Sequence, residues 1–212
     1  MGNPTTTTVL DGITARVAAV LDPRGLGGMS EDDLLSLLAA TERLGRRVDA
    51  LRVLAAGEVA ELSRNEVGRC GLAARKGCRN SAELLERVAQ VSGDTARKRI
   101  KTGRAVRGRL SLSGERLPAQ FAVVADAMVA GTIGLDSAHA IVAGLTALTH
   151  PVGRDVLQAA ETALVAAACG ATELSPVACA ADDIRNQAGV WRMFLDQDGS
   201  QRVSDCLCKS HI

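Results

Sequence analysis

The segment that most constrains the fold is residues 80–110, which has the pattern of a helix, a tight turn and a second, basic helix. Asn80 and Glu83 fit a capping box, and apolar residues then recur at the helical period, which predicts a first helix over residues 81–90. The following VSGD offers capping side chains and a glycine, so a second helix is expected over residues 94–110. A turn of about four residues between two helices is typical of a helix-turn-helix.

The second predicted helix separates apolar from basic residues around its axis. Its apolar arc consists of Ala96, Ile100, Gly103, Val106 and Leu110. The opposite arc presents five cations, Arg97, Lys98, Lys101, Arg104 and Arg109. Arg99 and Arg107 project from the apolar side, where each must extend to solvent or find a carboxylate.

Positive charge is concentrated in residues 64–109, where thirteen Lys and Arg face four Asp and Glu, a net charge of +9 in a chain whose total is +1. Such a block on helices is typical of proteins that bind the phosphate backbone of nucleic acids. The alternative is a solvated face paired with acidic residues of the same fold. Ahead of the first helix, Arg75, Lys76 and Arg79 extend the predicted phosphate-contacting surface.

Aromatic side chains are scarce, at 1% of the chain. Readers of RNA and of single strands stack bases on aromatic rings, so the expected nucleic-acid partner is duplex DNA, held through its phosphates. No Asn or Gln lies on the basic helix to read adenine, so we expect weak sequence preference. The core must be built mainly from Leu, Val and Ala.

A long helix is predicted over residues 31–62, because Ser30 can cap it and three carboxylates follow. Apolar residues along it alternate by three and four positions, as in a coiled coil. The candidate oligomerisation residues are Leu34, Leu37, Leu44, Val48 and Leu51. An internal helix of a bundle is favoured over a homodimer through residues 31–62, because Gly45 and Gly57 weaken the isolated helix.

The other segments complete an all-α prediction: a multi-helix bundle with a helix-turn-helix-like unit and one C-terminal strand or incomplete hairpin. Further helices are expected over residues 9–21, 118–130, 136–148, 151–168 and 176–188. The strand is VWRMFL at residues 190–195, followed by DQDG as a turn. Domain boundaries are placed to give an N-terminal helix and loop (1–29), a helical domain (30–189) and a truncated strand with an irregular tail (190–212).

No catalytic residue, metal site, cofactor or small-molecule substrate is predicted. His139 has no nucleophile or carboxylate cluster beside it in the sequence, so a structural imidazole is favoured. Cys206, Cys208 and His211 fit no common zinc spacing. Without a signal peptide or a stretch of about 20 apolar residues, we expect a cytoplasmic protein that does not enter a membrane.

Four phrases occur in one order over about residues 30–199: GLAARKG, NSAELLERVAQVSGDTARKRIKTG, LPAQFAVVADAMVAGTIGLDSAHAIVAGL and WRMFLDQDG. Together they resemble the actinobacterial domain of unknown function 222, which precedes HNH endonuclease domains and includes the 13E12-repeat proteins. The resemblance implies a helical domain that positions or regulates a metal-dependent DNA-cleaving module. Residues 200–212 depart from the family pattern, which indicates a truncated or frameshifted end.

An HNH site needs a histidine base and further ligands around a metal, and none of His139, His150 and His211 has an HNH-like setting. No nuclease activity is therefore carried over to this chain. The leading interpretation is a non-catalytic domain that docks on duplex DNA through its basic helix. The alternative is a helical protein-interaction or oligomerisation module without DNA binding.

Overall fold

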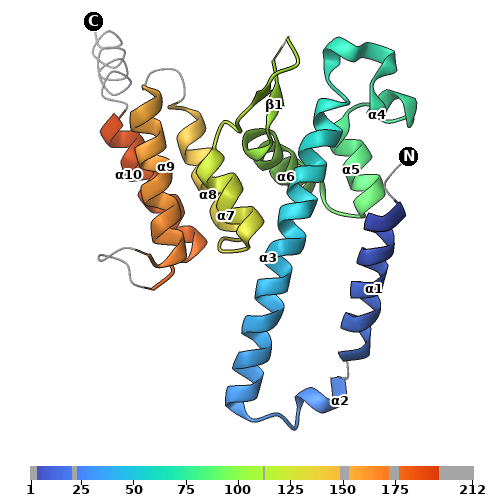
Figure 1. The fold of residues 1–212 in the computed structure, drawn as a ribbon, viewed down its shortest axis with the longest axis vertical. Coiled ribbons are helices and arrows are strands. Elements are labelled where there is room, and N and C mark those ends of the chain that lie inside the picture. The colour runs from blue at the N-terminus through green and yellow to red at the C-terminus, as the bar shows by residue number, and fades with distance from the viewer. Residues whose placement is uncertain (1–3, 21–22, 112, 149–152, 172–176, 196–212) are drawn as a thin grey trace, which may run out of the picture. The chain divides into compact units, whose positions relative to one another are not determined.

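The computed structural model describes residues 4–20, 23–111, 113–148, 153–171 and 177–195, and nearly all of its regular structure is helical (Figure 1). The all-α prediction is confirmed. The chain divides into two compact units, residues 1–42 and 43–212. The predicted DQDG turn, His150, His211, Cys206 and Cys208 lie outside the described residues.

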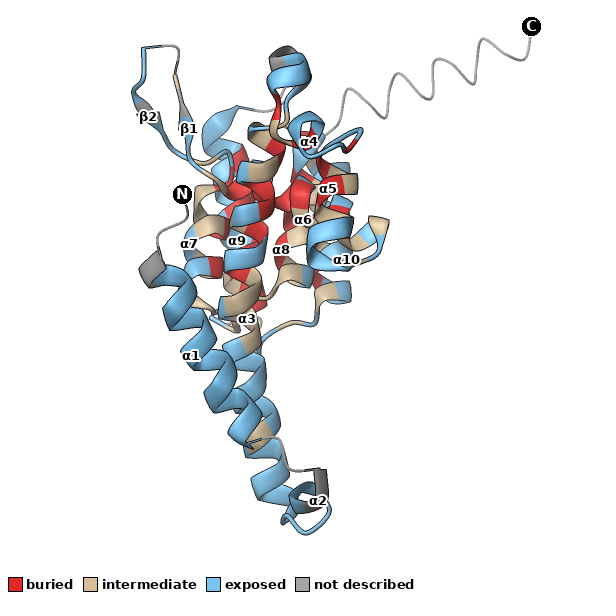
Figure 2. Ribbon diagram, turned by 90° about the vertical axis from the view of Figure 1, so that its right-hand side faces the viewer, coloured by how far each residue is buried: buried red, intermediate tan, exposed pale blue. Residues whose placement is uncertain are grey.

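The first unit contains α1 (Pro4–Val20), α2 (Pro23–Leu26) and the start of α3 (Glu31–Glu61), which continues into the second unit. Ser30 caps α3 as expected: its hydroxyl oxygen accepts the Asp33 N–H at 3.2 Å. Side chains at residues 6–20 and 25–42 include none that is buried, and α1 is exposed along its described length (Figure 2). This unit therefore has no apolar core of its own among those residues.

The second unit holds the core. Its elements after α3 are η1 (Asn65–Cys70), α4 (Leu72–Arg75), α5 (Ser81–Ala89), α6 (Gly93–Val106), β1 (Arg109–Leu110), β2 (Arg116–Leu117), α7 (Ala122–Ala130), α8 (Leu135–Thr146), α9 (Arg154–Cys169) and α10 (Ala181–Leu195). One apolar cluster contains residues from each of the helices α6, α7, α8, α9 and α10 and from part of α3. Phe121, Ile141, Leu145 and Leu164 are fully buried in it, so aliphatic side chains supply most of its volume.

The predicted helix-turn-helix-like unit is present as α5 and α6, which pack against each other. Asn80 caps α5, since its side-chain oxygen accepts the Glu83 N–H at 3.0 Å. Ser92 caps α6 in the same way through the Thr95 N–H at 3.2 Å. Between the helices, Gln90 takes a left-handed backbone conformation with φ 52° and ends α5.

Two glycines allow α3 and α6 to cross with their backbones in contact. A Cβ atom added at Gly57 of α3 would lie 2.7 Å from the carbonyl carbon of Gly103 on α6. A Cβ at Gly103 would in turn lie 2.7 Å from the Gly57 nitrogen. Arg107, at the end of α6, is held beside the same crossing by Glu58 and Glu61 of α3, at 3.1 and 2.5 Å. The backbone contact and the ion pairs of Arg107 therefore hold α6 against α3.

The predicted C-terminal strand is wrong, because residues 190–195 form the last turns of α10. The β-prone run VWRMFL continues a helical spacing that begins at Ile184 and Ala188, which are both buried. Trp191 and Leu195 extend this spacing and pack against the main core. Helical burial of one face therefore overrides the local preference for a strand.

The basic helix is shorter than predicted, since α6 ends at Val106 and Arg109 lies on β1. Two residues of β1 pair antiparallel with β2, and Gly114, with φ 82°, lies in the connecting turn. The following helix, α7, begins at Ala122 rather than at Pro118. Its start is fixed by Glu161 of α9, whose carboxylate accepts the Val124 N–H at 2.9 Å.

Candidate nucleic-acid interface

Three of the predicted cations form one line along α6. Arg97, Lys101 and Arg104 are four and three residues apart, and all three are exposed. We call this row the α6 stripe. It follows the exposed side of the helix, because Ala96, Gly103 and other residues on the packed side are buried. At 1.5 Å per residue, it covers about 10 Å along the axis, the rise of about three nucleotides in one strand of B-DNA.

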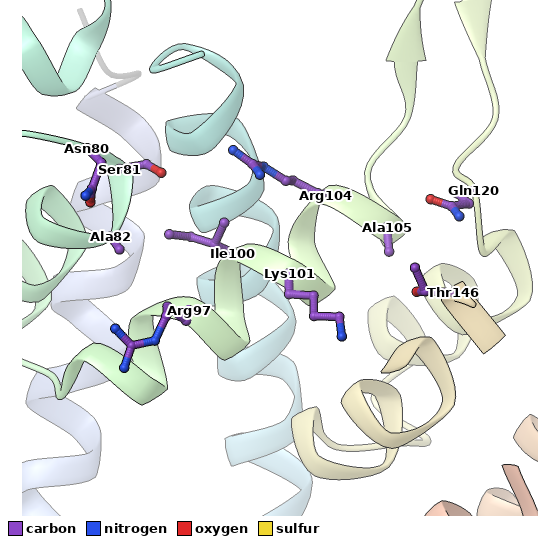
Figure 3. A pocket seen from close by; sticks show the side chains of 10 residues that line it. All are labelled: Asn80, Ser81, Ala82, Arg97, Ile100, Lys101, Arg104, Ala105, Gln120 and Thr146. Carbon is purple, nitrogen blue, oxygen red and sulfur yellow. The ribbon is translucent and has the colours of Figure 1, made fainter. Parts of the chain in front are cut away.

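The α6 stripe lines a groove of about 510 Å³. Figure 3 shows its side chains between the start of α5, with Asn80 and Ser81, and a second side that carries Gln120 and Thr146. No Asp or Glu is among the residues that line the groove. Cations together with amide and hydroxyl groups, and no lining carboxylate, make this an electrostatically favourable place for an anion.

Two members of the stripe keep their charge uncompensated. Lys101 and Arg104 make no ion pair with any residue that the structure describes. Arg97 bonds to the Asp94 carboxylate at 2.7 Å, but both side chains are largely exposed. An exposed pair three residues apart on a helix contributes only about 0–1 kcal/mol, so a phosphate can compete with Asp94 for Arg97.

The other two cations of the predicted basic arc lie elsewhere. Lys98 is half-buried and forms an ion pair with Asp136 at the start of α8. Arg109 is exposed on β1 and lines a different cavity of about 660 Å³, which also contains Arg154 and Glu161. The structure therefore brings three of the five cations together and separates the remaining two.

The cations ahead of α5 are all exposed. Arg75 ends α4, Lys76 follows it, and Arg79 precedes the cap of α5. Arg79 is held by Glu83, which accepts its backbone N–H at 2.8 Å and its Nε–H at 3.0 Å. These bonds, the backbone one first, lower the pKa of Glu83, and Arg87 adds a further opposite charge. Arg75 and Lys76 make no ion pair with a described residue.

His139 lies on α8, facing α6. Its Nδ1 atom is 3.0 Å from the hydroxyl of Thr102, which is fully buried. Partial burial lowers the pKa of His139, and the positive charges of Lys98 and Lys101 lower it further. Within the described part of the chain, no three His, Cys, Asp or Glu side chains are grouped so as to hold a metal ion.

The sequence did not identify the polar groups that complete the groove. Asn80 was identified only as a helix cap and Ser81 only as the first residue of a helix, and Gln120 and Thr146 carried no recognisable signal. Arg107 was expected either to extend to solvent or to find a carboxylate, and its partners, Glu58 and Glu61, precede it by more than forty residues. Such long-range pairs leave no local pattern in a single sequence.

The candidate oligomerisation residues lie off the packed face of α3. Its buried residues are Ala50, Val53, Ala56, Gly57 and Ala60. Leu34, Leu44 and Leu51 are 48%, 39% and 53% exposed, while Leu37 and Val48 are half-buried. The seam predicted from the sequence is therefore distinct from the face that packs against the rest of the second unit.

Fold and site together define an all-α domain in which a capped helix pair presents a short row of cations. The chain belongs to the family described as Domain of unknown function (DUF222), whose model matches residues 35–207. Neither a curated protein nor a solved structure is similar enough to match it. None of the described helices combines the length and apolar character needed to traverse a bilayer.

Proposed function

We propose that this chain docks on duplex DNA through the α6 stripe, with phosphate oxygens of one strand in the groove. The observation that carries the proposal is the row of Arg97, Lys101 and Arg104 in a groove lined by no carboxylate. Lysine and arginine contacts of this kind position a protein on DNA without reading its bases. Arg75, Lys76 and Arg79 are exposed and available for further phosphate contacts.

The resemblance to domain of unknown function 222, which precedes HNH endonuclease domains, suggests what the docking on DNA is for. In our proposal the domain is non-catalytic and positions an HNH nuclease module on the duplex. The nuclease chemistry then belongs to that module, because the grouped ligands that a divalent cation needs do not occur among the described residues. Incubating a duplex with this chain and Mg²⁺ should leave the DNA intact, and nicked product would contradict the non-catalytic part.

Docking is tested by fluorescence anisotropy with a labelled random-sequence duplex over a series of salt concentrations. If the three stripe cations each neutralise one phosphate, log affinity should fall against log salt with a slope of about −2.7. A slope of about −4.5 would mean that about two further cations also contact phosphates. A slope near zero would exclude phosphate docking.

The location is tested by the triple variant Arg97→Gln, Lys101→Gln, Arg104→Gln. All three residues are exposed, so we expect an intact fold and a slope smaller in magnitude by about 2.7. The matched control is Arg64→Gln, Arg185→Gln, Arg192→Gln, which removes the same charge from exposed residues outside the groove. Equal losses in both variants would show a general charge effect and overturn the proposed site.

A further inference from the structure

The exposed face of α3 carries a row of mostly apolar residues, and the intervals between them are the same when the row is read in either direction. We define the α3 seam as Leu34, Leu37, Thr41, Leu44, Val48 and Leu51. Alternation by three and four residues allows such a seam to interlock with a second helix. When two copies run antiparallel, Leu34 lies opposite Leu51, Leu37 opposite Val48, and Thr41 opposite Leu44. Each such pair of facing residues forms one layer of the interface, and each layer occurs twice, as a two-fold interface requires.

The charges along α3 favour the antiparallel direction. Residues 31–42 contain four carboxylates and no Lys or Arg, whereas residues 43–52 contain four arginines and one aspartate. Parallel pairing would place like charges side by side. Antiparallel pairing sets Glu31 near the second copy's Arg52 beside the outermost layer. Arg46 is not available to this interface, because its Nε–H donates to the Gly131 carbonyl at 2.8 Å on the packed side of α3.

Exposure supports a partner on this face. The leucines at positions 34, 44 and 51 are each more than a third exposed, although α3 packs Ala50, Ala56, Ala60 and Gly57 inside the second unit. Leu38, at 57% exposed, lies next to the seam on the helix surface and widens its apolar surface. Exposed apolar surface of this extent on one helix is typical of a protein interface.

We propose that a second copy of this chain covers the α3 seam as an antiparallel helix pair. The proposal does not depend on DNA binding, since none of the α6 stripe residues belongs to the seam. In the dimer each chain contributes the same set of layers, and Thr41 occupies the two central ones. Thr41 adds no unpaired polar group there, because its hydroxyl donates to the Leu37 and Leu38 carbonyl oxygens at 3.1 and 2.8 Å.

The oligomeric state is tested by light scattering coupled to size exclusion over a series of protein concentrations. We expect a mass of about twice the 22.0 kDa of one chain, falling to that of one chain in the variant Leu44→Lys, Leu51→Lys. The control Leu62→Lys, Val129→Lys replaces two other exposed apolar residues and should stay dimeric. Circular dichroism of each variant confirms that the helices remain.

The direction of the pairing is tested by exchanging charges. Glu31→Arg alone and Arg52→Glu alone each place like charges together and should weaken the dimer by several-fold. Mixing the two single variants restores both opposite-charge pairs, so a mixed dimer should form. A wild-type monomer at every concentration, a dimer unaffected by Leu44→Lys, Leu51→Lys, or single variants that do not rescue each other would overturn the proposal.

Discussion

At the scale of single residues, Glu161 is a buried carboxylate that holds the start of α7. It is 4% exposed, and its carboxylate accepts the Val124 N–H at the start of α7. Burial raises the pKa of Glu161 above its ordinary value of 4.5, and the charge of Asp126 acts in the same direction. Hydrogen bonds from the Val124 and Val123 N–H groups oppose this but do not cancel it.

The raised pKa predicts a loss of stability with rising pH. The unfolded chain releases this proton near pH 4.5, whereas the folded chain keeps it to higher pH, so the free energy of unfolding falls as pH rises through that window. Glu161→Gln retains an acceptor without the titration and should abolish this fall. Urea unfolding of both proteins from about pH 4 to pH 7 measures the difference. Parallel curves would show that Glu161 does not titrate in this way.

Capping residues are the part of the site that the sequence predicts well, because a cap and its partner lie within four positions. Asn80 was read correctly as the cap of α5. Glu83, the other half of the predicted capping box, bonds to the Arg79 N–H instead. Glu161 could not be found in the same way, because 37 residues separate it from the N–H group that it binds.

At the scale of helices, the two glycines of α3 differ in a way that their sequence does not reveal. Both reduce the intrinsic helix propensity by about 1 kcal/mol relative to alanine. Gly57 meets the backbone of Gly103, whereas an added Cβ at Gly45 has no atom within 4 Å. The same substitution in one helix should therefore have opposite effects on stability.

We expect Gly57→Ala to lower the free energy of unfolding by about 1–3 kcal/mol, because the new methyl group forces α3 and α6 apart. Gly45→Ala should raise it by about 0.5–1 kcal/mol. Urea unfolding of the two variants beside the wild type measures both changes. If Gly57→Ala also stabilised the protein, the close crossing of α3 and α6 would be contradicted.

The helix ends and the wrongly predicted C-terminal strand show where a local sequence pattern is not sufficient to predict secondary structure. Val190 and Phe194 are strand-prone and largely exposed, so the run VWRMFL by itself gives no clear helical pattern. The helix is set by burial of Ile184 and Ala188, which lie six and two residues before the run begins. The basic arc likewise included Arg109 because its angular position fits, although the chain leaves the helix before reaching it.

At the scale of the whole chain, the buried residues and the N-terminal helices are separate in the sequence. Every described residue that is buried lies at Ala50 or later. In α1, Val9, Leu10, Ile13 and Val17 are all between 39% and 57% exposed. Composition predicted an aliphatic core, but it could not indicate that the described residues of the first unit contribute none of it.

This division predicts that residues 1–29 contribute little to folding. A chain that begins at Ser30 keeps α3 with its cap and all of the buried residues described here, so its free energy of unfolding should differ from that of the full chain by less than about 1 kcal/mol. Because it also keeps the α3 seam, it should retain the proposed dimer. Urea unfolding and light scattering of both chains measure the two outcomes. A loss of several kcal/mol would mean that α1 packs against the protein in solution, and loss of the dimer alone would assign the apolar residues of α1 to the interface.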